Sequence, residues 1–196
     1  MNKPLLIILN GLVATGKTTT AKAISKSMNI SVIHSDVYWF KNKEKIVERA
    51  SDRKISEVHN EMLLSKCGEY IGRGESVILD CTSRWRSFRE KIIERFVQQS
   101  DIIFVRCYCP EKIAIGRIDK RSSEGPHGFG SKAEYYRVKN EYDSINDIER
   151  KNFSLLSVDT DKSKTCIETI AKPELKEVLD EMCDAIEKND FSKFVS

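Results

Sequence analysis

The segment Pro4–Thr20 constrains the fold of this chain more than any other stretch of its sequence. It opens with the apolar run Leu5–Leu9, which is typical of a strand buried on both faces of a sheet. The residues Gly11–Thr18 then fit the pattern G-x-x-x-x-G-K-[ST], and a helix-forming segment, Thr19–Met28, follows. Strand, glycine-containing loop and helix therefore occur in the order that a phosphate-binding loop requires.

This loop predicts that the chain binds a nucleotide. Backbone N–H groups of the loop and of the helix N-terminus would point at phosphate oxygens, and the helix dipole favours the negative charge there. Lys17 is expected to reach the β- and γ-phosphates, and the Thr18 hydroxyl to ligate Mg²⁺. We therefore predict ATP and Mg²⁺ as cofactors, with ATP held by Gly11, Leu12, Val13, Ala14, Thr15, Gly16, Lys17, Thr18 and Thr19.

Length and composition set outer limits on the function. A chain of 196 residues is expected to form one domain, spanning 1–196. Its net charge of +3 does not by itself indicate a nucleic-acid binder, although basic residues gather in the centre of the sequence. The six cysteines lack metal-ligand spacing and are expected to be reduced, in a cytoplasmic protein. No stretch predicts a membrane span or a signal peptide.

Strands that alternate with helices predict an α/β fold of three layers with a parallel five-stranded sheet. The segment Val37–Lys45 is expected to be a loop that leads into a helix. Ligands of such sheets collect at the carboxyl ends of the strands, so the phosphate loop, Asp36 and Asp80 are predicted to converge on one site. The predicted strands are Leu5–Leu9, Ile30–His34, Ser76–Asp80, Ile102–Val105 and Phe153–Val158.

Two carboxylates at strand ends each have two interpretations. Asp36 could act as a catalytic base that accepts a proton from an acceptor hydroxyl, or it could cap the helix that follows. Asp80 ends the apolar run VILD, as a Walker-B type acidic residue does. We predict that it binds Mg²⁺ together with Thr18, and helix capping is again the alternative.

The pair Arg117 and Arg121 lies one helical turn apart, ahead of the glycine-rich segment Gly125–Gly130. The pattern predicts a lid, approximately residues 117–133, whose two guanidinium groups act catalytically at the phosphates of ATP. A solvated helix face is the alternative interpretation. His127 falls within this lid, and the sequence does not indicate its role.

A second group of arginines follows Asp80. Arg84 and Arg89 are candidates, with Asp36, for binding the acceptor, because a guanidinium group can hold an anionic substrate. The alternative is a solvated helix face, on which Arg86 would form an ordinary ion pair with Glu90.

These motifs together resemble those of the small P-loop kinases, a group that includes polynucleotide 5′-hydroxyl kinases and overlaps with gluconate kinases, zeta-toxin-like kinases and antibiotic phosphotransferases. The resemblance runs through GLVATGKTT, HSD, VILDCTSRWRSFRE and the Arg117/Arg121 pair, and so covers nearly the whole chain. It implies a P-loop NTPase fold, in which Asp36 activates the acceptor hydroxyl, Asp80 organises the metal or acceptor side, and the arginine pair lies over ATP. Arg89 is similar to the arginine that follows the second aspartate in many members.

The sequence departs from the pattern of this group at two places. Val13 and Ala14 stand where members commonly have Pro-Gly, which a phosphate loop tolerates. Trp39 stands where polynucleotide kinases tend to carry an arginine that binds the acceptor phosphate. The second departure counts against a polynucleotide acceptor and leaves the kinase interpretation intact.

The sequence as a whole predicts an ATP- and Mg²⁺-dependent kinase that phosphorylates a hydroxyl. The acceptor stays open between a nucleic-acid or nucleoside 5′-OH and a small metabolite or antibiotic. The alternative from another class is a nucleotide switch or ATPase module. A switch does not need an acceptor-side aspartate beside an arginine lid, and this favours the kinase. The sequence does not indicate the oligomeric state.

Overall fold

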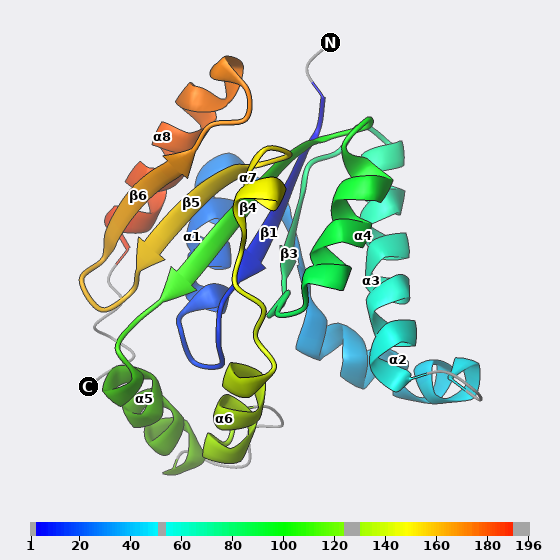
Figure 1. Ribbon diagram of the computed structural model, residues 1–196, viewed down its shortest axis with the longest axis vertical. Helices are drawn as coiled ribbons and strands as arrows, with labels where there is room; N and C mark the ends of the chain where they lie inside the picture. Colours follow the sequence, from blue (N-terminus) through cyan, green and yellow to red (C-terminus); the bar gives the residue numbers. More distant parts are fainter. Residues whose placement is uncertain (1–2, 51–53, 124–129, 190–196) are drawn as a thin grey trace.

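The computed structural model describes residues 3–50, 54–123 and 130–189. At its centre is a six-stranded sheet with the strand order β2-β3-β1-β4-β5-β6 (Figure 1). The first five of these strands are parallel, and β6 pairs antiparallel with β5. The strands are β1 (Leu5–Asn10), β2 (Ser31–His34), β3 (Val77–Asp80), β4 (Asp101–Tyr108), β5 (Ser154–Asp159) and β6 (Lys164–Thr169).

The α/β prediction is confirmed, and the predicted number of strands is corrected from five to six. The additional strand, β6, lies at the edge of the sheet and carries Lys164 and Glu168 among half-buried residues. An edge strand needs no continuous apolar run, because only one of its sides is paired. The apolar patterns that predicted the other five strands are therefore missing from β6.

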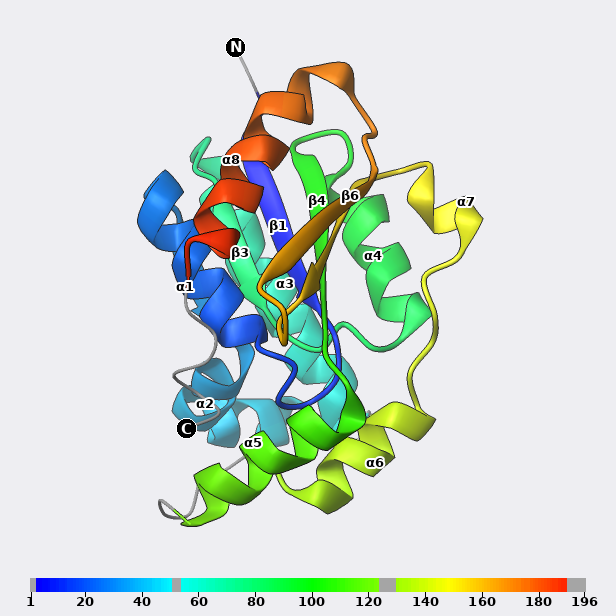
Figure 2. The same cartoon turned by 90° about the vertical axis from the view of Figure 1, so that its left-hand side faces the viewer.

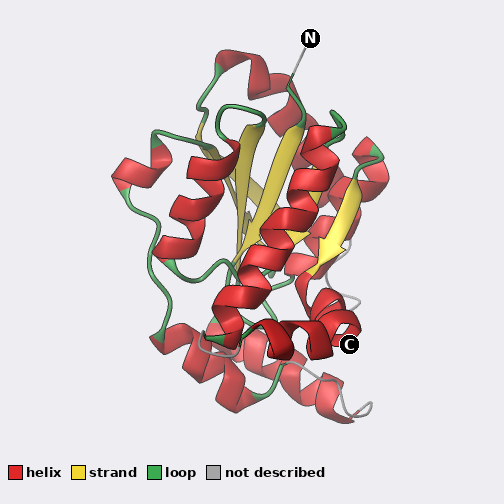
Figure 3. Ribbon diagram, turned by 90° about the vertical axis from the view of Figure 1, so that its right-hand side faces the viewer, coloured by secondary structure: helices red, strands yellow, loops and turns green. Residues whose placement is uncertain are grey.

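Helices cover both faces of the sheet and make up the other two layers. Figures 1 and 2 show α1 and α8 together on one face, and Figure 3 shows α3 and α4 on the other. The helices α5 and α6 lie beyond the carboxyl ends of the strands (Figure 1). The helices are α1 (Lys17–Met28), α2 (Ser35–Arg49), α3 (Ile55–Gly72), α4 (Arg86–Phe96), α5 (Glu111–Ser123), α6 (Lys132–Asn140), α7 (Asp147–Arg150) and α8 (Lys176–Glu187), the last preceded by the 3₁₀ turn Pro173–Leu175.

Strand β1 shows why the apolar run predicts a buried position. Leu6 and Ile8 pack with the core beneath α3 and α4, whereas Ile7 and Leu9 pack with the core beneath α1 and α8. All four side chains are fully buried. Each contributes about 1.5–3 kcal/mol relative to an exposed position. The strand is thereby fixed, and the loop that follows it starts from a rigid base.

Helix α2 corrects the prediction of a loop over Val37–Lys45. The helix begins at Ser35, directly after β2, because the extended backbone of His34 serves as its N-cap. Ile46 is its one buried residue, so the helix lies at the edge of the molecule and has little of the apolar periodicity that indicates a helix. As a consequence, Asp36 lies in the first helical turn.

Within the described ranges, no helix combines the length and the apolar character that crossing a membrane requires. No disulfide joins the six cysteines, all of which the structure describes, and Cys67, Cys81 and Cys107 are buried.

Candidate active site

The loop between β1 and α1 has a backbone that only small residues can follow. Gly11 has φ +144°, and a Cβ atom at this position would lie 2.2 Å from the main-chain oxygen of Cys107. Gly16 has φ +85° and lies against Thr160, and Ala14 also has a positive φ of 61°. The two glycines of the motif are therefore required by the close approach of the loop to β4 and to the chain that follows β5.

The N-terminus of α1 is open to a ligand. Gly16 occupies the N-cap position, and no side chain of the described residues caps the helix there. The first N–H groups of the helix are therefore available to an anion, which is the arrangement found at phosphate sites. Lys17 donates a hydrogen bond from Nζ to the main-chain oxygen of Leu12, at 2.6 Å, and its burial lowers the pKa of its ammonium group.

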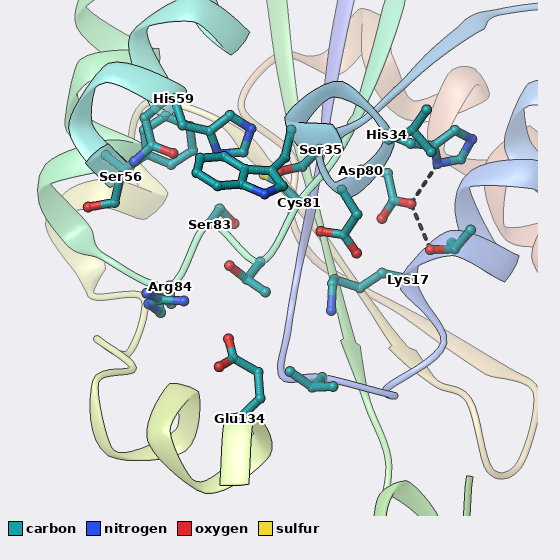
Figure 4. A pocket seen from close by; sticks show the side chains of 18 of the residues that line it. Lys17, His34, Ser35, Ser56, His59, Asp80, Cys81, Ser83, Arg84 and Glu134 are labelled. Atoms are coloured by element: carbon teal, nitrogen blue, oxygen red, sulfur yellow. Dashed lines mark hydrogen bonds and ion pairs between the residues drawn. The ribbon is translucent and has the colours of Figure 1, made fainter. Parts of the chain in front are cut away.

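Asp80 lies at the carboxyl end of β3, next to this helix. The Thr18 hydroxyl donates to Asp80 Oδ2 at 2.7 Å, and the same oxygen lies 2.9 Å from His34 Nδ1. Figure 4 shows both contacts as dashed lines. His34 and Asp80 are paired in register on the neighbouring strands β2 and β3, so the sheet itself sets their distance.

Thr18 and Asp80 offer the oxygen ligands that Mg²⁺ prefers. The residues described contain no group of three or more His, Cys, Asp or Glu side chains that could hold a metal ion. Magnesium in nucleotide sites is bound by one or two protein oxygens together with phosphate oxygens and water. The pair found here fits that donor set, and it would hold the ion only when a nucleotide is present.

Asp36 faces the same site from the first turn of α2. It is not the cap of that helix, since His34 occupies the N-cap position and no side-chain cap bond is formed. Desolvation raises the pKa of Asp36, and the charge of Asp80 raises it further, whereas Lys17 lowers it. Asp36, Lys17 and Asp80 all line the same cavity.

A cavity of about 1040 Å³ joins these groups. We call its two parts the donor half and the acceptor half. The donor half is lined by the phosphate loop, Lys17, Thr18 and Arg121. The acceptor half lies beyond Asp36 and is lined among others by Trp39, His59, Arg84, Trp85 and Glu134. Figure 4 shows Lys17 and Arg84 on opposite sides of this space, with Glu134 below them.

The arginine pair of α5 is divided between two environments. Arg121 lines the cavity. Arg117 is only 4% exposed and does not line it. Its guanidinium donates to the main-chain oxygen of Ala14 at 3.3 Å and to that of Thr160 at 2.9 Å. In this structure Arg117 therefore braces the phosphate loop, which corrects the prediction that it lies over ATP.

The predicted lid is described only in part. Of the segment 117–133, residues 124–129 lie outside the described part of the chain, and His127 is among them. Ser131 caps α6, its hydroxyl accepting a hydrogen bond from the N–H of Glu134 at 3.1 Å. After α6 the chain returns to the sheet, where the Tyr142 hydroxyl donates to Asn10 Oδ1 at the end of β1.

Arg89 is not placed to bind an acceptor. Its side chain is fully buried and forms an ion pair with Glu149, with Nε 2.7 Å from Oε1. It also donates to the main-chain oxygen of Ser83 at 3.0 Å. The prediction that Arg89 contacts the acceptor is therefore corrected to a structural role. Arg86 is exposed and does not line the cavity, whereas Arg84 does.

Several lining residues were not singled out by the sequence. Glu134 lies on α6, and its side chain lines the cavity. His59 lies on α3 and reaches the cavity beside Trp39, with 5.4 Å between their ring centroids. No local pattern marks either residue, because α3 and α6 are brought to the cavity by tertiary packing alone.

A family of known proteins matches the part of the chain that contributes most of these groups. The model of a family described as "AAA domain" matches residues 6–139, which include the phosphate loop, Asp36, Asp80 and Arg121. A search of curated proteins found none that matches this chain.

Solved structures with the same fold include proteins named as kinases. A gluconokinase from Sinorhizobium meliloti has a TM-score of 0.56 at 16% identity and covers 95% of this chain and 93% of its own. The APS kinase CysC of Mycobacterium tuberculosis, in complex with AMPPNP and APS, has a TM-score of 0.54 at 16% identity, covering 93% and 99%. Kti12 of Chaetomium thermophilum, in complex with ADP-AlF3, has a TM-score of 0.66 at 16% identity, covering 92% and 98%. At these identities the likeness shows the fold that this chain shares with them.

Proposed function

The chain belongs to the AAA domain family, and from that premise we propose that it is an ATP- and Mg²⁺-dependent kinase that transfers the γ-phosphate to a hydroxyl acceptor. The observation that carries the proposal is the two-sided cavity. A phosphate loop lines one half of it, and Asp36 faces that loop from across the space. The solved structures of similar fold include two proteins named as kinases, which supports the same reaction class.

In the donor half, the N-terminus of α1 binds the phosphates through its free N–H groups. Lys17 exchanges the main-chain oxygen of Leu12 for phosphate oxygens, so that its ammonium group neutralises charge on the transferring group. Arg121 adds a second cation from α5. Mg²⁺, held by Thr18 and Asp80, would supply further charge neutralisation at the phosphates.

In the acceptor half, Asp36 orients the hydroxyl of the acceptor and takes its proton. The acceptor oxygen then forms the new bond to the γ-phosphorus, the bond to the β–γ bridging oxygen breaks, and ADP leaves. The raised pKa of Asp36 brings the carboxylate closer to the pKa that suits a general base near neutral pH. The acceptor itself is a nucleic-acid or nucleoside 5′-OH, or the hydroxyl of a small metabolite or antibiotic.

Two variants test this assignment. Lys17→Ala should abolish the release of ADP from ATP while the far-UV circular dichroism stays unchanged, and Lys26→Ala, an exposed change on the same helix, should leave turnover intact. Asp36→Asn should leave ATP binding near normal and remove phosphate transfer, with Glu48→Gln on α2 as the matched control. The readout is transfer of labelled γ-phosphate to a panel of hydroxyl compounds.

The outcomes distinguish the kinase from an ATPase or switch module. Transfer that depends on both Lys17 and Asp36 supports the kinase. Hydrolysis of ATP that depends on Lys17 but not on Asp36, with no acceptor phosphorylated, would identify an ATPase. Transfer at the wild-type rate in Asp36→Asn would remove Asp36 from the mechanism.

A further inference from the structure

We propose that the acceptor is an uncharged ring compound that carries the reacting hydroxyl, such as a sugar or a nucleoside without a phosphate group. This inference rests on the proposed kinase function and specifies its substrate class. It follows from the charges and the rings that line the acceptor half of the cavity.

Both guanidinium groups of the acceptor half are already matched by carboxylates of the chain itself. Arg84 Nε lies 3.1 Å from Glu141 Oε2, an ion pair that lacks hydrogen-bond geometry, and the side chain of Arg84 is only 12% exposed. Its guanidinium also stacks on the indole of Trp85, at 3.9 Å from the ring centroid. The carboxylate of Glu141 thus offsets the charge of Arg84, and the indole of Trp85 positions its guanidinium.

Arg137, on α6, is committed in the same way. One of its terminal nitrogens lies 2.6 Å from Glu134, and the other lies 3.2 Å from Glu141. Among the described cationic side chains that line this half, Lys54 alone has no carboxylate partner, and it is exposed to solvent, where its charge is screened.

In this half an anionic acceptor would therefore meet ion pairs that are already formed and the carboxylate of Asp36, unpaired among the described residues, rather than free cations. Asp36, Glu134 and Glu141 all line the cavity. Like charges brought together in a binding site cost several kcal/mol, so a phosphate or carboxylate on the acceptor is selected against. An ammonium group on the acceptor would instead pair with Asp36, and this would engage the group that must accept the hydroxyl proton.

The uncharged part of the wall is aromatic. Trp39, Trp85 and the ring of His59 line the acceptor half, and Trp39 offers a flat surface on which a sugar ring or a base can stack. Burial lowers the pKa of His59, so its ring is neutral at pH 7. Its Nε2 atom is buried and finds no hydrogen-bond partner among the described residues. A buried polar atom of this kind at a cavity wall suits a hydrogen bond with a neutral ligand.

The test compares acceptors that differ in one substituent and in the charge that it carries. Labelled γ-phosphate transfer is measured for glucose, glucuronate and glucosamine, and for thymidine against thymidine 3′-monophosphate. The neutral member of a series should have a kcat/KM at least about tenfold higher than its charged relatives, which corresponds to about 1.4 kcal/mol. The two series also separate a sugar acceptor from a nucleoside acceptor.

The failures of the two proposals are distinguishable. Preferential transfer to the anionic or the ammonium members would overturn the inference about charge and leave the kinase standing. Transfer to no hydroxyl compound of any charge class, with ATP binding retained, would overturn the proposed function and this inference with it.

A change of the chain's own charge gives an independent test. Glu141→Gln releases Arg84 and part of Arg137 from their carboxylate, so the kcat/KM ratio of glucuronate to glucose should rise at least about tenfold. Glu44→Gln removes the same charge from an exposed position of α2 and should leave the ratio unchanged. An unchanged ratio in folded Glu141→Gln would contradict the claim that these ion pairs set the selectivity.

Discussion

Replacement of Arg89 should damage the stability of the protein and not its affinity for the acceptor. The side chain is fully buried, and its two main partners are the carboxylate oxygens of Glu149, at 2.7 and 3.2 Å. Three main-chain oxygens, those of Ser83, Arg84 and Ser144, accept its remaining hydrogen bonds. In Arg89→Leu these acceptors lose their donor, and the carboxylate of Glu149, itself 3% exposed, is left without its counter-charge.

The size of the loss follows from this geometry. Breaking a buried ion pair by removing one partner costs about 3–5 kcal/mol. For a protein of this length that corresponds to a fall in Tm of about 6–20 °C. Glu149 keeps one hydrogen bond, from the main-chain N–H of Asn146 at 3.1 Å, so the lower part of the range is expected.

The assay is urea unfolding followed by tryptophan fluorescence, with KM for ATP and for the acceptor measured well below Tm. The double variant Arg89→Leu/Glu149→Leu should recover part of the lost stability, because no unpaired charge remains buried. Arg86→Leu, an exposed change on the same helix, should have a small effect. A loss below about 1 kcal/mol in Arg89→Leu, accompanied by a raised acceptor KM, would refute the structural role and restore the one predicted from sequence.

Other perturbations test other parts of the structure. Gly11→Ala should lower the free energy of unfolding by at least about 1–3 kcal/mol, because the new Cβ would clash with the main-chain oxygen of Cys107. Gly116→Ala should raise the free energy of unfolding by about 0.8–1 kcal/mol, because its Cβ would meet nothing within 4 Å and alanine favours the helix. Urea unfolding measures both changes. Transfer activity should rise as the pH rises through the raised pKa of Asp36, because the base must be ionised to accept a proton. Asp36→Asn should abolish the activity and with it this rise. The same variant should raise Tm at pH 7, because it removes an ionised form that the native state disfavours, and this gain should vanish below the ordinary pKa of 3.8, as a thermal melt at each pH would show. Iodoacetamide should modify exposed Cys166 and spare Cys107 in the native protein, since burial raises the pKa of the latter thiol to about 12; mass spectrometry reads the sites.

The sequence predicts those parts of the molecule that short-range patterns determine. The apolar run of β1 and the glycines after it define the phosphate loop, and the polar residues that end β2 and β3 indicate where Asp36 and Asp80 lie. The rule that ligands collect at the carboxyl ends of parallel strands then brings these groups to one edge.

Pairings between distant segments could not be predicted in this way. Arg89 and Glu149 are 60 residues apart in the chain, and Arg117 and Thr160 are 43 apart. An arginine that braces a loop and an arginine that binds a substrate have the same local sequence. The partner alone distinguishes them, and tertiary packing determines the partner.

The anchoring of the segment between Arg117 and Tyr142 has a consequence for the thermodynamics of nucleotide binding. One end is tied to the phosphate loop through the oxygen of Ala14, and the other is tied to the end of β1 through Asn10. The entropy lost when a chain segment has its two ends brought together is therefore already lost in the free protein. Arg121 already lines the cavity, so its contact with a bound nucleotide requires no further closure of the chain. Less of the interaction energy between Arg121 and the phosphates is therefore spent on ordering the chain, and the affinity for the nucleotide is correspondingly higher.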